Sequence, residues 1–302
     1  NISGITFNYS GTPTQGTHYN VRRNAAATAI TFDNVSGNLG KYLYEDDDEA
    51  SPSATSGLLR WPPITETNWT GAVNSDWHIA GNWDNGVPTS LIDAIIPNRS
   101  NDPRITNANA ECKNLTITDG SLILEADRRL DAYGDVTIGT GTSPGILTFG
   151  TSNSILAVGG LWTRGTNGIF SHGNGTVIFN SGAGSATILP RNSDFYKVRF
   201  DNALTTFYLS GSTINFKGDF EILNGTVTPA TNNYTYNMEG DFINSGGTFT
   251  PVAGGVTNGT VVFNSAVDQN ITGGTFYNLT IDGSNDKITN GTATIDNVTT
   301  IN

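Results

Sequence analysis

Short stretches in which apolar and polar residues alternate recur along most of this chain, separated by Gly, Asn or Ser. In Asn114–Ile117, for example, Leu115 and Ile117 fall on one side of an extended strand and the polar residues on the other. Alternation with a period of two predicts half-buried β-strands rather than helices. Further strands are predicted at Gly145–Phe149, Ser154–Val158, Gly168–Phe170, Lys197–Phe200, Thr213–Phe216, Thr226–Val227, Tyr236–Met238 and Thr248–Phe249.

One of these stretches returns almost unchanged further along the chain. Asn174–Ser181 reads NGTVIFNS, and Asn258–Ser265 reads NGTVVFNS. Each copy begins with Asn-Gly, a strong turn signal, and continues as a short alternating strand. A related motif is centred on Leu115, Val198 and Leu279, which are almost equally spaced. The sequence therefore predicts a super-repeat of about 82 residues, with a truncated third copy.

The spacing of the strands indicates the kind of β-structure. Strands that arrive about every 8–12 residues also suit a sandwich or a barrel. The motifs, however, align at multiples of about 20 residues, which suits one coil of a solenoid, and the buried positions are β-branched or aromatic. We predict an all-β chain whose main part is a right-handed parallel β-helix. About nine coils, each rising by roughly 4.8 Å, would form a rod of roughly 40 Å.

The pattern divides the chain into three parts. Residues 1–60 are predicted to be a small β-rich segment, with strands at Ile5–Tyr9 and Ala29–Phe32 and an acidic loop at the end. Residues 61–106 form a tryptophan-rich cap or first coil, and residues 107–302 form the β-helix repeats. Because the sequence stops inside a third repeat, we expect it to be a piece of a longer protein.

Four of the five tryptophans, Trp61, Trp69, Trp77 and Trp83, lie close together in the sequence. A solenoid exposes apolar core at each end, so large aromatic residues placed just before the repeats would seal the stack. Alternatively, Trp69, Trp77 and Trp83 form a platform on which sugar rings stack. We favour the cap, because the cluster lies where the repeats begin.

The same segment resembles a known kind of protein. It reads NWTGA at Asn68–Ala72, continues through Trp77 to GNWDNGVP at Gly81–Pro88, and ends in AIIP at Ala94–Pro97. This pattern is similar to one in very large, repetitive, adhesin-like surface proteins of bacteria that use type IX secretion. The repeats that follow resemble those of parallel β-helix surface proteins. The resemblance implies an exported protein of the bacterial cell surface.

Composition and charge exclude several classes of partner. The net charge is −12, and the longest basic runs are the pairs Arg22–Arg23 and Arg128–Arg129, so neither nucleic acid nor an anionic membrane surface is an expected partner. No apolar run approaches the length of a membrane-spanning helix, about 18 residues or more. The single Cys112 allows no internal disulfide. It falls where the strand pattern predicts a small buried residue.

The strongest candidate for catalysis is the charged stretch Glu125–Asp131. In one strand, Asp127, Arg129 and Asp131 would share a face, and β-helix enzymes that act on polysaccharides use carboxylates with Arg or Lys on an outer face. Glycoside hydrolysis needs two carboxylates at a set separation. We prefer the interpretation of a surface salt-bridge network, since such networks are common on exposed strands.

Metal and nucleophile motifs are sparse. His18, His78 and His172 are isolated, with no metal-binding or catalytic spacing. The acidic run contains Asp46 and Asp48, candidates for Ca²⁺, which prefers oxygen ligands. Consecutive side chains point in different directions, so we expect a solvated loop and no cofactor.

The sequence therefore predicts a non-catalytic, structural or adhesive segment of a large secreted protein at the bacterial cell surface. Its expected partners are surface polysaccharide or other cell-surface and secretion proteins. A polysaccharide-active β-helix enzyme, a lyase or a glycoside hydrolase, and a glycan-binding module remain as alternatives.

Overall fold

The chain separates into two compact units, residues 1–65 and residues 66–302. A computed structural model of the protein describes residues 44–46, 58–60, 64–191, 193–251, 258–283 and 285–302. In the first unit, β1 (Tyr44–Asp46) pairs antiparallel with β2 (Leu58–Arg60). The strands predicted at Ile5–Tyr9 and Ala29–Phe32 lie outside the described residues.

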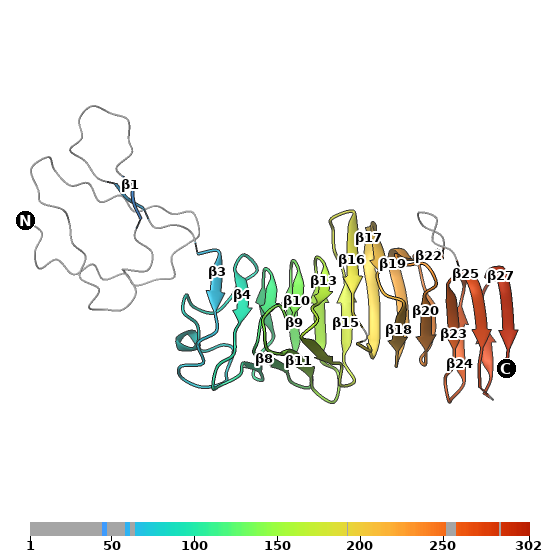
Figure 1. Ribbon diagram of the computed structural model, residues 1–302, viewed down its shortest axis with the longest axis horizontal. Coiled ribbons are helices and arrows are strands. Elements are labelled where there is room, and N and C mark those ends of the chain that lie inside the picture. The colour runs from blue at the N-terminus through green and yellow to red at the C-terminus, as the bar shows by residue number, and fades with distance from the viewer. Residues whose placement is uncertain (1–43, 47–57, 61–63, 192, 252–257, 284) are drawn as a thin grey trace, which may run out of the picture. The chain divides into compact units, whose positions relative to one another are not determined.

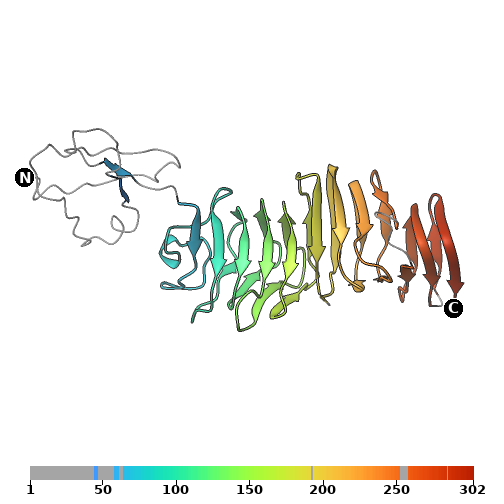
Figure 2. The same cartoon turned by 45° about the horizontal axis from the view of Figure 1, so that its top comes forward.

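The second unit is a β-solenoid of about nine turns, in which strands pair in parallel with strands of neighbouring turns (Figure 1). Figure 2 shows the same stack of strands after rotation. Helix in the described residues is limited to the three-residue 3₁₀ turn η1 (Ala80–Asn82). The predicted all-β, parallel β-helical class is thus confirmed.

Each coil contributes up to three strands, and strands at the same position of successive coils pair side by side to form a row. The three rows are numbered in the order in which one coil passes through them. The first row is β3 (Glu66–Asn68), β4 (Asp93–Ile96), β7 (Leu115–Ile117), β10 (Val136–Ile138), β13 (Trp162–Arg164), β16 (Ser185–Leu189), the later parts of β17 (Lys197–Leu209) and β19 (Phe220–Pro229), and β22 (Thr248–Phe249).

The second row contains a break, which falls between β14 and β18. Its members are β5 (Arg104–Ile105), β8 (Ser121–Leu124), β11 (Gly145–Phe149), β14 (Gly168–Ser171), β18 (Thr213–Phe216), β20 (Thr235–Met238), β23 (Thr260–Phe263), and the later parts of β25 (Gly274–Ile281) and β27 (Ala293–Ile301).

The third row is continuous from β6 to β26. Its members are β6 (Ala110–Cys112), β9 (Arg129–Ala132), β12 (Ile155–Val158), β15 (Thr176–Phe179), the first parts of β17 and β19, β21 (Phe242–Asn244), β24 (Gln269–Thr272) and β26 (Lys287–Thr289).

Alternation along each strand fills the interior. Leu115, Ile117 and Phe200 are buried, as the period-two pattern predicts. In the later coils the inward positions hold rings, and successive ring centroids lie 5.4, 5.2 and 5.4 Å apart along the series Phe179, Phe200, Phe220 and Phe242. Aromatic pairs at such separations add to the free energy gained from burial alone. The core is therefore one continuous column that passes from coil to coil.

The structural repeat differs from the sequence repeat. Val136 pairs with Leu115 of the previous coil, 21 positions earlier, whereas Trp162 pairs with Val136, 26 positions earlier. Because coil lengths vary, the recurring motif changes row: Leu115 lies in the first row, Val198 in the third and Leu279 in the second. The super-repeat is thus not a whole number of coils.

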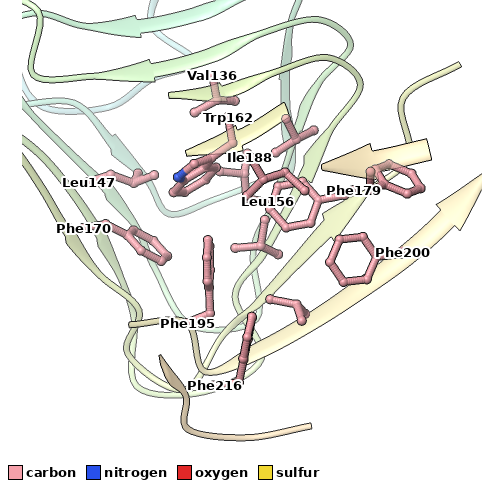
Figure 3. Close-up of a cluster of buried hydrophobic side chains, with 14 of the residues drawn as sticks. Val136, Leu147, Leu156, Trp162, Phe170, Phe179, Ile188, Phe195, Phe200 and Phe216 are labelled. Carbon is pink, nitrogen blue, oxygen red and sulfur yellow. The ribbon is translucent and has the colours of Figure 1, made fainter. Parts of the chain in front are cut away.

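The break in the second row lies over a cluster of rings. Among the described residues, β14 pairs in this row with β11 alone. The next coil passes this position between β16 and β17, and there the described residues join the row at Phe195 alone, through a bridge to Phe216. Trp162 lies 5.0 Å from Phe170 and 5.5 Å from Phe195, measured between ring centroids (Figure 3). Large aromatic side chains therefore fill the core where the strands are interrupted.

Removal of one ring from the column tests its contribution to stability. We expect Phe220→Ala to lower the free energy of unfolding by about 3–5 kcal/mol, because it deletes a buried ring and leaves a cavity. Leu204 is 81% exposed, so Leu204→Ala should change the same quantity by less than about 0.5 kcal/mol. Denaturant unfolding followed by circular dichroism measures both, and equal effects would contradict the buried column.

Cys112 offers a second test. Its side chain is fully buried in β6, as predicted, and burial strongly raises the pKa of its thiol, with smaller contributions from nearby carboxylates. The thiolate is the reactive form, so we expect no labelling of the native protein by a thiol reagent at about pH 8 and rapid labelling in denaturant. Rapid labelling of the native chain would show that β6 is accessible.

Candidate functional site

The three described tryptophans of the N-terminal region form one buried cluster. Trp69 and Trp77 have no exposed surface and Trp83 is 4% exposed. Trp83 makes edge-to-face contacts with both of the others, at centroid distances of 5.1 Å to Trp69 and 4.7 Å to Trp77. The hypothesis of an exposed sugar platform at these positions is therefore wrong for this structure, because no ring face is open for a sugar to stack on.

The loop that carries these indoles acts as an abbreviated coil below the first full one. Its start, β3, pairs with β4 in the first row. Further along, Asp76 forms a parallel bridge with Arg104 of β5, so the loop continues the second row as well. The Trp69 indole N–H donates to the carbonyl of Asn101 at 2.6 Å. The loop thus covers the N-terminal end of the stack, which is the position that a cap requires.

Asn82, at the end of η1, fixes the shape of this loop. Its buried side-chain oxygen accepts from the backbone N–H groups of Val73 and Asn74, both at 2.9 Å. Its amide group donates to the Asn74 side chain at 2.8 Å and to the Asp76 carbonyl at 2.9 Å. All four hydrogen-bonding positions of one asparagine are used, and the sequence motif alone did not indicate this role.

The charged stretch Glu125–Asp131 does not form one strand with three outward charges, and that part of the prediction is wrong. Asp127 precedes β9 and has a φ of +60°, so it belongs to a turn. Its carboxylate accepts from the Asn153 side chain of the next coil at 2.9 Å. The turn takes Asp127 out of the alternation that the sequence pattern assumed, so it is separated from the face shared by Arg129 and Asp131.

Arg129 and Asp131 do share a face of β9, where they pair with each other. The guanidinium Nε donates to both carboxylate oxygens, at 2.9 and 3.0 Å, and Nη2 donates to one of them at 2.6 Å. Hydrogen bonding to Asp131 raises the pKa of Arg129. Both Asp131 oxygens are thereby engaged by the arginine, an arrangement typical of a partly exposed structural ion pair.

A small hollow of about 140 Å³ lies beside this pair. Its lining includes Asp131, Tyr133, Ala157, Gly159 and Asn180, from successive coils of the third row and the turns after them. Tyr133 is 57% exposed, and a Cβ atom at Gly159 would come within 2.1 Å of the Tyr133 carbonyl oxygen. The hollow can accept a small polar group against an exposed ring.

Along the outer wall, charges pair from one coil to the next. Three ion pairs, Lys197–Asp219, Arg199–Glu221 and Lys217–Glu239, each join residues 22 positions apart, which is one coil. Hydrogen bonding to these carboxylates raises the pKa of Lys197 and of Lys217. Each pair is half exposed and contributes little to stability by itself. In each of the three pairs a cation of one coil is matched by an acid of the next coil.

A larger opening, called here the interruption groove, lies where the second row is broken. It has a volume of about 550 Å³. Its lining comes from the end of β13, from β14 with the turn after it, and from two residues that follow β16: Arg164, Ile169, Phe170, Ser171, His172, Gly173, Ser193 and Asp194.

The sequence pattern did not single out this opening. Arg164 and Arg191, which lie next to each other in the fold, are 27 positions apart in the chain. That separation in sequence is close to the length of the coil in which Trp162 pairs with Ile188. It is the signal in the sequence that could have indicated that the two arginines are neighbours. Using it requires the coil length, which the sequence does not state directly.

The remaining candidates concern metals and membranes. Asp46 ends β1 and Asp48 lies outside the described residues, so the Ca²⁺ hypothesis stays a prediction. Among the described residues, no group of three or more His, Cys, Asp or Glu side chains could hold a metal ion. In the same part of the chain, no helix has the length and apolar character of a membrane span.

Comparison with protein-family models gives a match to part of the chain. A family model described as a domain of unknown function (DUF8693) matches residues 68–166, about a third of the chain. The matched segment begins in the tryptophan-rich loop and extends just beyond β13. No curated protein and no solved structure matches the chain.

The four hydrogen bonds of Asn82 predict a large local effect of its removal. We expect Asn82→Ala to lower the free energy of unfolding by about 2–4 kcal/mol, since it removes the four hydrogen bonds of a fully buried side chain that holds the loop in shape. Asn98 is an exposed residue of the same region, and Asn98→Ala is the matched control, with an expected change below about 0.5 kcal/mol. Tryptophan fluorescence during denaturation measures both, because the cap holds three of the five tryptophans, and an unchanged midpoint for Asn82→Ala would contradict the assigned role.

Proposed function

We propose that this chain is a structural and adhesive segment, without catalytic activity, of a large secreted protein at the bacterial cell surface. The observation that supports it best is the pairing of outward charges between neighbouring coils, as in Lys197–Asp219 and Arg199–Glu221. An outer surface whose cations pair with acids of the next coil, around a continuous apolar core, suits a stiff spacer between other parts of a surface protein. Extracellular location and type IX export rest on the resemblance of the segment from Asn68 to Pro97.

Two other features fit this role. The buried tryptophan cluster lies at the N-terminal end of the stack, where a solenoid needs its exposed core covered. The single thiol is buried and far from its reactive ionised form, which suits an oxidising environment. Expected partners are surface polysaccharide and other cell-surface or secretion proteins.

The rival proposal, a polysaccharide lyase or hydrolase, would draw on Asp127 and Asp131. In the structure Arg129 engages both oxygens of Asp131, and Asp127 accepts from Asn153 in a turn. Glycoside hydrolysis requires one carboxyl group to give a proton and another to attack or to activate water. The ion pair and the turn position both favour a structural role for these two carboxylates.

A turnover assay separates the two proposals. We expect the full chain to release neither reducing sugar nor unsaturated product from pectin, alginate or chitin-like polymers over hours. Enzymes accelerate such reactions by about 10⁶-fold or more, so weak activity would still be detected.

Two variants make the assay specific. Asp127→Ala/Asp131→Ala removes the candidate carboxylates, and Asp282→Ala removes an exposed carboxylate elsewhere as a control. Product formed by the parent chain and by Asp282→Ala, but lost in the double variant, would overturn the structural proposal.

A further inference from the structure

The interruption groove holds an arginine whose charge has no counterion among the described residues. Nη1 of Arg164 donates to the carbonyl of Arg191, and Nε is buried without an acceptor. An arginine offers five N–H donors; one from Nη1 is used by Arg191 and the Nε–H is buried, so the other Nη donors have no partner among the described residues. Burial, together with the nearby charge of Arg191, lowers the pKa of Arg164. A partly buried cation left in this state is stabilised by any anion that can reach it.

This environment differs from that of other arginines in the stack. Arg104, Arg129 and Arg199 each pair with a carboxylate, from Glu125, Asp131 and Glu221 respectively. Arg164 instead lies beside a second arginine, in a chain whose net charge is −12.

Arg191 adopts an uncommon backbone conformation. Its φ is +47°, in the left-handed region that arginine rarely adopts. In this conformation its carbonyl accepts the hydrogen bond from Arg164, while its own side chain is exposed. Asp194 is the acid in the groove lining, and its carboxylate accepts from the Asn215 side chain at 2.7 Å.

The rest of the lining suits a sugar chain. Ile169 is 42% exposed, and the ring of His172 stacks on Tyr196 with a centroid distance of 5.9 Å and an interplanar angle of 19°. Flat rings and small apolar surfaces pack against the C–H faces of sugars. At about 550 Å³, the groove falls within the range of ligand sites.

We propose that the interruption groove binds an anionic sugar chain, and that Arg164 and Arg191 pair with its carboxylate or sulfate groups. The planar guanidinium fork matches both groups and binds them through two parallel hydrogen bonds. This inference rests on the proposed adhesive function and names its ligand class. It places recognition at the break in the strands, away from the wall of paired charges.

Calorimetric titration of the full chain at low salt provides the test, with three polymers as probes. Polygalacturonate carries carboxylates, dextran sulfate carries sulfates and dextran is neutral. We expect at least one charged polymer to bind, which identifies the anion, and dextran not to bind. Arg164→Gln and Arg191→Gln should each weaken that binding about tenfold, the effect of losing a charged hydrogen bond.

Arg99→Gln is the matched control, because Arg99 is exposed and donates to the Asn98 carbonyl. It should leave the affinity unchanged. Arg191 is also exposed, so its variant should fold normally even if Arg164→Gln does not, and circular dichroism checks both. The proposal is overturned if no charged polymer binds, if dextran binds equally well, or if Arg99→Gln weakens binding as much as Arg191→Gln. None of these results bears on turnover, so the proposed function is tested separately.

Discussion

No single coil of this protein can bury its own apolar residues. A coil has three short strands, and each turns alternate side chains inward, where they contact mainly the coils above and below. The parallel backbone pairing and the column of rings through Phe200, Phe220 and Phe242 are therefore two aspects of one constraint. The cap, the ion pairs between coils and the filled core at the break all follow from the need to keep neighbouring coils in register.

The sequence allowed the local structure to be predicted well. Alternation at Leu115 and Ile117 indicated both the strand and its buried face, since a period of two leaves little choice. It did not allow the row of each strand to be predicted, because rows depend on coil length, which already changes between the coils that begin at Leu115 and at Val136. The positions of Asp127 and of the interruption groove could not be predicted either, because both depend on where a turn interrupts the alternation.

The outer surface has regions of two kinds, which differ in whether their charged side chains are paired. Where coil lengths are regular, as from Lys197 to Glu239, opposite charges lie one coil apart and neutralise each other. Where the second row is interrupted, Arg164 meets Arg191 instead of an acid. Irregularity in a solenoid thus creates both the space and the charge that a binding site needs, whereas the regular part supplies rigidity.

The shift of the recurring motif from row to row has a consequence for how such a chain can lengthen. In amyloid fibres identical segments stack directly on one another, and that self-complementarity promotes uncontrolled growth and slippage. Here the near-identical segments Asn174–Ser181 and Asn258–Ser265 lie several coils apart and in different rows, the third and the second, so neither stacks on the other. Each copy therefore faces strands of different sequence, and the repetition in this chain does not supply the directly stacked identical segments on which a cross-β fibre depends.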